Sequence, residues 1–188
     1  MRKWLAIGFS LLCSAAMVAQ TAVTMADLPY FCDFEEENEN SNWVLNPSIE
    51  SISTLNAWHV GSAASYTGEK ALYVSSDSGL TASYATIGNV LIAYRDVRLD
   101  RGTYDVAFDW MGMGNGLNGY VKVVFEARDT KSIKCLGNSV EPAWVSEAIP
   151  LMGGEEYLGD ADSWRHMQAS FTIPRALANA EDTRVLFI

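Results

Sequence analysis

Asp33 and Glu35, near the start of the chain, are the best candidates for metal ligands. The segment Tyr30–Glu35 predicts a strand, and alternate side chains of a strand share a face. Calcium prefers several oxygen ligands, often carboxylates mixed with backbone carbonyls, and the turn at Tyr66–Lys70 could add such carbonyls. We therefore expect a structural Ca2+ ion at Asp33 and Glu35. The alternative is a pair of solvated acids at the start of a strand.

Trp144 and Tyr157 are the candidate ligand-binding residues. Both lie in residues 130–162, the longest stretch without regular patterning, which predicts an elaborated surface loop. Exposed Trp and Tyr rings combine an apolar face with a polar tip and can stack on sugars. In the alternative reading this loop packs onto the core and covers both rings. The strand patterns predict core positions for four other tryptophans, Trp43, Trp58, Trp110 and Trp164.

The motifs do not favour catalysis. Gly114–Gly119 matches GxGxxG, but a dinucleotide site needs a helix after the glycines, and the β-branched segment that follows predicts a strand. The two histidines, His59 and His166, fall in strand patterns, and the chain has no HExxH or GxSxG motif. We therefore expect no catalytic residues.

Carboxylate pairs of the kind that glycosidases use are a separate possibility. Asp105 and Asp109 share one face of a predicted strand, opposite its aromatic face. We interpret them as solvated charges on the outer surface.

Charge excludes one class of partner. The chain of 188 residues has 13 basic and 23 acidic residues and a net charge of −10. An acidic protein repels phosphate backbones, so we expect no nucleic-acid partner. The length suits one domain that buries a sizeable core.

The first 19 residues resemble a secretory signal peptide. Met1-Arg2-Lys3 is a basic start, and an uncharged apolar run of about 16 residues follows, shorter than the ~20 that a spanning helix needs. Cleavage after Ala19 leaves 11 basic and 23 acidic residues, a net charge of −12. We expect a secreted or cell-surface protein with no integral membrane segment, and a short linker at residues 20–29. The remaining cysteines, Cys32 and Cys135, form either a disulfide or two separate buried thiols.

The rest of the chain predicts an all-β protein. Apolar and polar residues alternate in many short segments with turn residues between them, and the one helix-like segment is Pro174–Asp182. This pattern indicates an antiparallel β-sandwich or jelly roll. The chain stops inside a predicted strand, Arg184–Ile188, so we expect the last strand to be lacking. The clearest alternating segments are Tyr104–Trp110, Val121–Glu126 and Arg165–Ile173, and other strand candidates are Trp58–Val60, Ala71–Ser75 and Val90–Val97.

Several spaced segments together resemble the MAM-like jelly-roll modules of Bacteroides-type (Bacteroidota) surface and secreted proteins, a group that includes choice-of-anchor and cleaved-adhesin domains. They are YFCDFE (30–35), NW (42–43), AWHVGSA (57–63), GEKALYVSSDSG (68–79), AYRDV (93–97), YDVAFDWMGMG (104–114), YVKV (120–123) and SWRHMQASFTIP (163–174). The resemblance covers residues 30–188. It implies a non-catalytic module, and a calcium ion that ties the first strand to the last.

We therefore expect a recognition or adhesion module of a bacterial surface protein that binds glycan or host protein. The alternative is a carbohydrate-binding accessory domain of a secreted hydrolase or peptidase. A third reading is a jelly-roll glycosidase or lyase.

Overall fold

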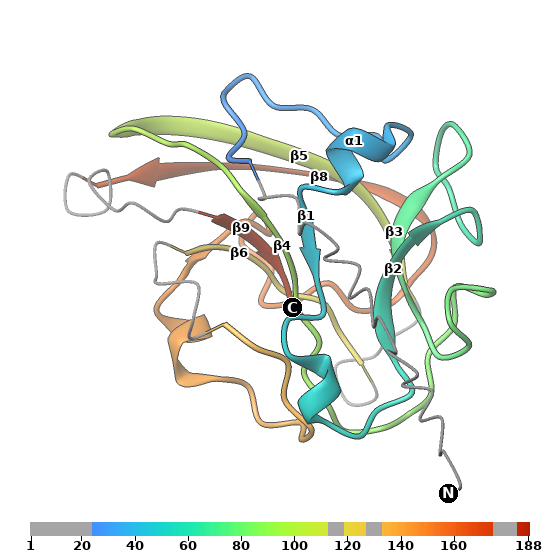
Figure 1. The fold of residues 1–188 in the computed structure, drawn as a ribbon. Coiled ribbons are helices and arrows are strands. Elements are labelled where there is room, and N and C mark those ends of the chain that lie inside the picture. Colours follow the sequence, from blue (N-terminus) through green and yellow to red (C-terminus); the bar gives the residue numbers. More distant parts are fainter. Residues whose placement is uncertain (1–23, 113–118, 127–132, 175–183) are drawn as a thin grey trace, which may run out of the picture.

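The computed structural model describes residues 24–112, 119–126, 133–174 and 184–188, which fold mainly into short antiparallel strands (Figure 1). This confirms the prediction of a mostly β protein. The expected signal peptide at 1–19, the glycines Gly114 and Gly116 of the GxGxxG motif, and the expected helix beyond Pro174 lie outside the described residues.

The strands form three antiparallel groups. The largest is a five-stranded sheet in the order β1 (Trp43–Leu45), β4 (Ala93–Asp96), β9 (Arg184–Phe187), β6 (Val123–Glu126) and β7 (Ile149–Pro150). A hairpin pairs β2 (Ala57–Gly61) with β3 (Ala71–Ser75), and a long ribbon pairs β5 (Gly102–Gly112) with β8 (Ala161–Ile173). The described helices are short: α1 (Glu37–Asn40) and two 3-10 helices, η1 (Ile49–Ser51) and η3 (Ala143–Ser146).

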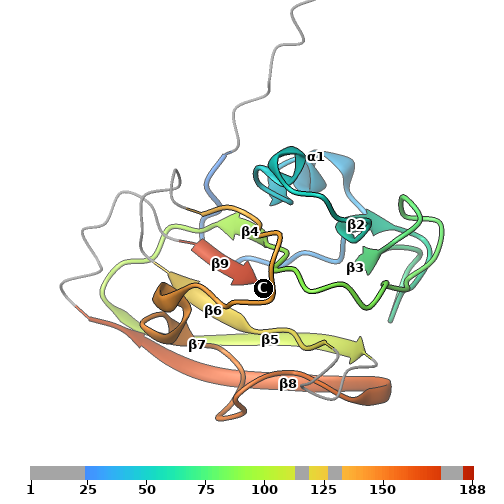
Figure 2. The ribbon, with the colours of Figure 1, turned by 90° about the horizontal axis from the view of Figure 1, so that it is seen from below.

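The β5–β8 ribbon follows the predicted alternation. The aromatic side of β5, with Tyr104, Phe108 and Trp110, packs inward, while Asp105 and Asp109 on the other side are exposed. The ribbon lies along one face of the five-stranded sheet (Figure 2). One core cluster fills the space between these layers, with Phe125 of β6 against Phe171 of β8 at 5.6 Å between ring centroids.

A second core cluster covers the opposite face of the same sheet. Tyr94 of β4 and Val124 of β6 pack there with Trp58 of β2 and with Val145 from the irregular stretch after β6. All four residues of β6, Val-Val-Phe-Glu, are therefore buried. This sheet has no solvent-facing side at β6.

The expected strand at Tyr30–Glu35 is wrong. These residues form no strand, because Phe34 has a left-handed backbone with φ of 65° and the helix α1 begins at Glu37. A strand residue needs negative φ, so the segment cannot continue as a strand through Phe34. The backbone that meets the sheet edge is instead that of Ala26, whose N–H donates to the Asp96 carbonyl at 3.0 Å.

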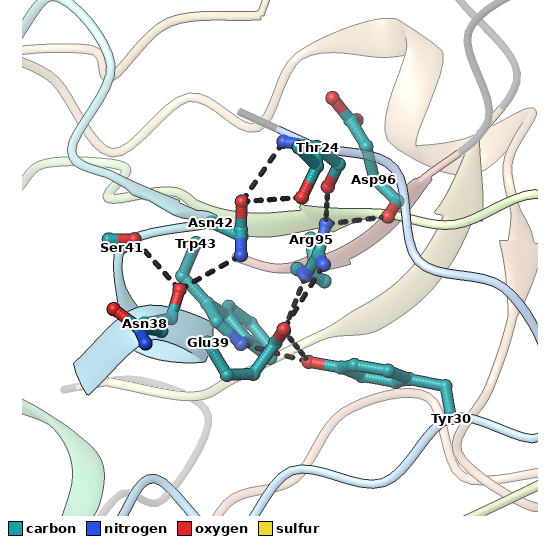
Figure 3. A network of polar contacts seen from close by, with 9 residues as sticks. All are labelled: Thr24, Tyr30, Asn38, Glu39, Ser41, Asn42, Trp43, Arg95 and Asp96. Carbon is teal, nitrogen blue, oxygen red and sulfur yellow. Dashed lines mark hydrogen bonds and ion pairs between the residues drawn. The ribbon is translucent and has the colours of Figure 1, made fainter. Parts of the chain in front are cut away.

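Arg95 of β4 fastens this N-terminal segment to the sheet (Figure 3). Its side chain is 3% exposed, and its Nε donates to Glu39 Oε1 of α1 at 2.7 Å. The guanidinium also donates to the backbone carbonyls of Thr24 and Asp96 and lies over the Tyr30 ring. The Tyr30 hydroxyl donates to the same Glu39 oxygen at 2.7 Å.

Burial of this network changes the acidities of its members. Burial and the nearby Glu39 raise the pKa of Tyr30. Burial alone would raise the pKa of Glu39, but the hydrogen bonds from Arg95 and Tyr30 outweigh it and lower that pKa. Burial alone would lower the pKa of Arg95, but the hydrogen bond and the negative charge of Glu39 outweigh that effect and raise it. The ion pair therefore stays charged at neutral pH.

Candidate functional site

Glu35 caps a turn. Its Oε1 accepts hydrogen bonds from the backbone N–H groups of Glu69 at 2.7 Å and Lys70 at 2.8 Å. The turn at Tyr66–Lys70 therefore does meet Glu35, as the sequence suggested, but it presents donors to this oxygen and not carbonyls. Gly68, with φ of +71°, makes the approach possible, because a Cβ there would lie 2.3 Å from Glu35 Oε1.

Asp33 has a local role. Its Oδ1 accepts a hydrogen bond from the Glu35 backbone N–H at 3.1 Å. Because the two residues do not lie on a strand, the shared strand face that placed them together is absent. In the described part of the chain, no group of three or more His, Cys, Asp or Glu residues is arranged to hold a metal. The calcium site stays a prediction, and the geometry adds no support to it.

Trp144 lies in η3, where its ring is half-buried. It packs against the second core cluster, beside Val145. The structure thus places this ring in the packing role that was the alternative reading of the loop. Of the four tryptophans predicted to be core residues, Trp43 and Trp58 are buried. Trp110 is partly buried and packs against the first core cluster. Trp164 is also partly buried, and its ring centroid lies 5.5 Å from that of Tyr66.

Tyr157 is exposed and pairs with a second tyrosine. Its ring centroid lies 5.3 Å from that of Tyr120, and the two residues are 38% and 40% exposed. Tyr84, 39% exposed, approaches the backbone next to Tyr120, since its hydroxyl is 2.7 Å from where a Cβ on Gly119 would be. Glycine at 119 therefore leaves the space that Tyr84 occupies.

An ion pair adjoins these rings. Lys122 Nζ lies 2.9 Å from Glu141 Oε2, and the Tyr120 hydroxyl donates to the same oxygen at 3.3 Å. Lys122 also lies 5.8 Å from the Tyr120 ring centroid. Burial, followed by the charge of Glu141, raises the pKa of Tyr120, so its hydroxyl stays a donor at neutral pH. We call Tyr84, Tyr120, Tyr157, Lys122 and Glu141 the tyrosine cluster.

A single backbone bridge positions three members of this cluster, Tyr120, Lys122 and Tyr157. Val121 and Leu158 pair antiparallel, each N–H donating to the other carbonyl at 2.8 Å. Because side chains alternate along extended backbone, Tyr120, Lys122 and Tyr157 fall on the side opposite to Val121 and Leu158. Leu158 is buried, so the tyrosines face outward. The alternation in Tyr120–Val123 was visible in the sequence, whereas the pairing across 37 residues was not.

The outer face of the β5–β8 ribbon carries paired polar residues. Asp109 Oδ1 lies 3.0 Å from His166 Nδ1, and the Ser170 hydroxyl donates to Asp105. These groups are exposed or half-exposed, in agreement with the interpretation of solvated charges. Cys32 and Cys135 are two separate free thiols, the alternative to a disulfide; Cys135 is buried and Cys32 only partly so, and burial raises the pKa of the Cys135 thiol.

No protein-family model matches the chain, and no curated protein matches it. The resemblance to MAM-like modules therefore rests on the spaced sequence segments alone. Among the described residues, no helix has the length and apolar character needed to cross a membrane.

Proposed function

We propose that this protein is a non-catalytic recognition or adhesion module, secreted or displayed on the bacterial cell surface, that binds glycan through the tyrosine cluster. The single observation that carries the proposal is the pair of half-exposed rings of Tyr120 and Tyr157, of which Tyr120 also contacts the Lys122–Glu141 ion pair. In this proposal the strands form a jelly-roll β-sandwich of MAM-like type.

The chemistry of the cluster suits a sugar. A pyranose has an apolar face of C–H groups that packs on an aromatic ring, and its hydroxyls need donors and acceptors at the ring edge. Tyr120 and Tyr157 supply the rings, and a tyrosine contributes a large contact area at a small cost in side-chain entropy. Glu141 can accept from a sugar hydroxyl and Lys122 can donate to one.

The same cluster would serve a carbohydrate-binding accessory domain joined to a secreted hydrolase or peptidase. A host or surface protein is the other partner class that the proposal includes. Tyrosine is enriched at protein interfaces for the same physical reasons.

A panel of immobilised bacterial and host polysaccharides, probed with the purified chain, tests the glycan proposal. We expect saturable binding to at least one polysaccharide, reduced about tenfold by Tyr157→Ala, which corresponds to roughly 1.4 kcal/mol. Tyr66→Ala removes an exposed aromatic ring outside the cluster and should leave binding unchanged. Release of sugar products by the wild-type chain would contradict the non-catalytic assignment.

A further inference from the structure

A second surface, separate from the tyrosine cluster, combines a hollow with aromatic and acidic side chains. A hollow of about 170 Å3 lies in residues 31–40, between the N-terminal segment and α1. Its lining combines two aromatic rings with three carboxylates, one amide and one thiol, from Phe31, Phe34, Asp33, Glu36, Glu39, Asn40 and Cys32. None of these residues belongs to the tyrosine cluster.

Phe31 is the first unusual feature of this hollow. The residue is 81% exposed, which leaves a large apolar ring in water at its rim. Leaving a Phe side chain exposed forgoes about 1.5–3 kcal/mol of burial energy. An exposed ring next to a lined hollow is typical of a contact residue for a partner.

Uncompensated charge is the second feature. Of the three lining carboxylates, Glu39 is paired with Arg95. Asp33 and Glu36 make no ion pair in the described part of the chain, and both are exposed. The hollow thus offers two carboxylates to an incoming positive charge, in a protein whose net charge is already −10.

The part of the hollow formed by Phe34, Glu39 and Asn40 is held in place before any partner arrives. Asn40 Nδ2 donates to the Phe34 carbonyl at 2.7 Å, and the Phe34 ring packs 5.3 Å from that of Trp43. Hydrogen bonds from Arg95 and Tyr30 hold the Glu39 carboxylate in place (Figure 3). A fixed receptor loses little entropy on binding, so a small contact area can suffice.

We propose that this hollow binds the side chain of an arginine or lysine from a protein partner. The aliphatic stem would lie along the Phe31 and Phe34 rings, and the charged head would pair with Asp33 and Glu36. Long cationic side chains bury their stems in this way while the head stays near water. A guanidinium or ammonium over an aromatic face gains further attraction.

An organic cation fits this site better than a metal ion. Calcium takes six to eight oxygen ligands. Here two of the nearby carboxylate oxygens already accept backbone hydrogen bonds: Asp33 Oδ1 from the Glu35 N–H, and Glu35 Oε1 from the turn at 66–70. Apolar rings offer nothing to calcium but do contact a side-chain stem. The volume accommodates one side chain and not a folded element.

An NMR titration of the full chain with the peptide acetyl-Gly-Gly-Arg-Gly-Gly-amide tests the proposal. We expect saturable shifts of amide resonances in residues 31–40, weaker binding at high salt, and no saturable shifts with a citrulline peptide, which keeps the shape but removes the charge. Glu36→Gln and Phe31→Ala should each weaken binding about fivefold or more. Glu37→Gln, an exposed acid of α1 outside the lining, should change it less than twofold.

Three results would overturn the inference. Equal weakening by Glu36→Gln and Glu37→Gln would show a diffuse attraction to an acidic surface. Unaltered binding in Phe31→Ala would remove the aromatic wall from the site. Shifts in residues 31–40 with calcium alone, and none with the arginine peptide, would identify a metal site instead. None of these outcomes bears on glycan binding by the tyrosine cluster, so the two proposals fail separately.

Discussion

Arg95 and Glu39 show how one buried charge can organise the start of a domain. The guanidinium is almost fully buried and satisfied by a carboxylate, two backbone carbonyls and an aromatic ring. A buried charge is tolerated when it is paired and hydrogen-bonded. Its partners come from the N-terminal segment, α1 and β4, so the pair selects the position of α1 on the sheet.

Replacing the carboxylate should expose this dependence. We expect Glu39→Gln to lower the free energy of unfolding by about 1–3 kcal/mol at pH 7, because the buried guanidinium keeps a neutral acceptor but loses its counter-charge. Chemical denaturation measures the change. Glu37→Gln, on the exposed side of the same helix, is the matched control and should change stability by less than about 0.5 kcal/mol.

The pair also predicts a pH dependence. The pKa of Glu39 is lower in the folded state than in the unfolded chain, so its stabilisation is complete above the unfolded value, near 4.5, and is lost as the pH falls through the folded value. The wild-type free energy of unfolding should therefore fall more steeply below about pH 4.5 than that of Glu39→Gln. Parallel curves for the two proteins would show that Glu39 contributes nothing through its charge.

Gly68 offers a second test at single-residue scale. Gly68→Ala would strain a left-handed backbone and push on the Glu35 carboxylate, which accepts two hydrogen bonds from the turn. We expect a loss of roughly 2–4 kcal/mol in thermal or chemical unfolding. Gly154 also has a positive φ, of +98°, but no atom lies within 4 Å of its Cβ position. Gly154→Ala should therefore lose only the part of the stability that comes from backbone strain. Equal losses would mean that the Glu35 contact is dispensable.

At the scale of elements, the alternation of apolar and polar residues predicted the long strands better than it predicted the N-terminal segment. Tyr104–Trp110 and Met167–Ile173 alternate because each strand of the ribbon has one buried and one exposed side, and that alternation is visible in the residues. The predicted strand Ala71–Ser75 is β3 with the same bounds. The Tyr30–Glu35 segment also alternates, but the left-handed Phe34 and the Arg95 pair override the pattern. Neither is visible in a local window of sequence.

The burial of both faces of β6 leads to a testable prediction about its two valines. Val123 and Val124 point to opposite faces, and both are at most 2% exposed. We expect Val123→Ala and Val124→Ala to lower the free energy of unfolding by similar amounts, about 1–3 kcal/mol each. In a sheet with one solvated face, the outward valine would cost almost nothing. Chemical denaturation of the two variants distinguishes these cases.

At the scale of the whole molecule, the candidate surfaces depend on contacts between distant parts of the chain. Sequence reasoning selected Tyr157 as an exposed aromatic, and the structure exposes it. It missed Tyr120 as the neighbour of Tyr157, because the bridge between Val121 and Leu158 brings the two together, and it missed the contacts of Tyr84 with Gly119 and of Glu141 with Lys122. It also selected Trp144, whose half-buried ring in η3 packs against the second core cluster.

The most direct test of glycan recognition is a calorimetric titration of one polysaccharide fragment into three proteins: the wild type, Tyr157→Phe and Tyr157→Ala. Stacking needs the ring and not the hydroxyl, so Tyr157→Phe should bind within about twofold of the wild type. Tyr157→Ala should bind about tenfold more weakly, a loss of roughly 1.4 kcal/mol. Wild-type affinity in Tyr157→Ala, with the fold intact, would contradict a role for the tyrosine cluster in glycan binding.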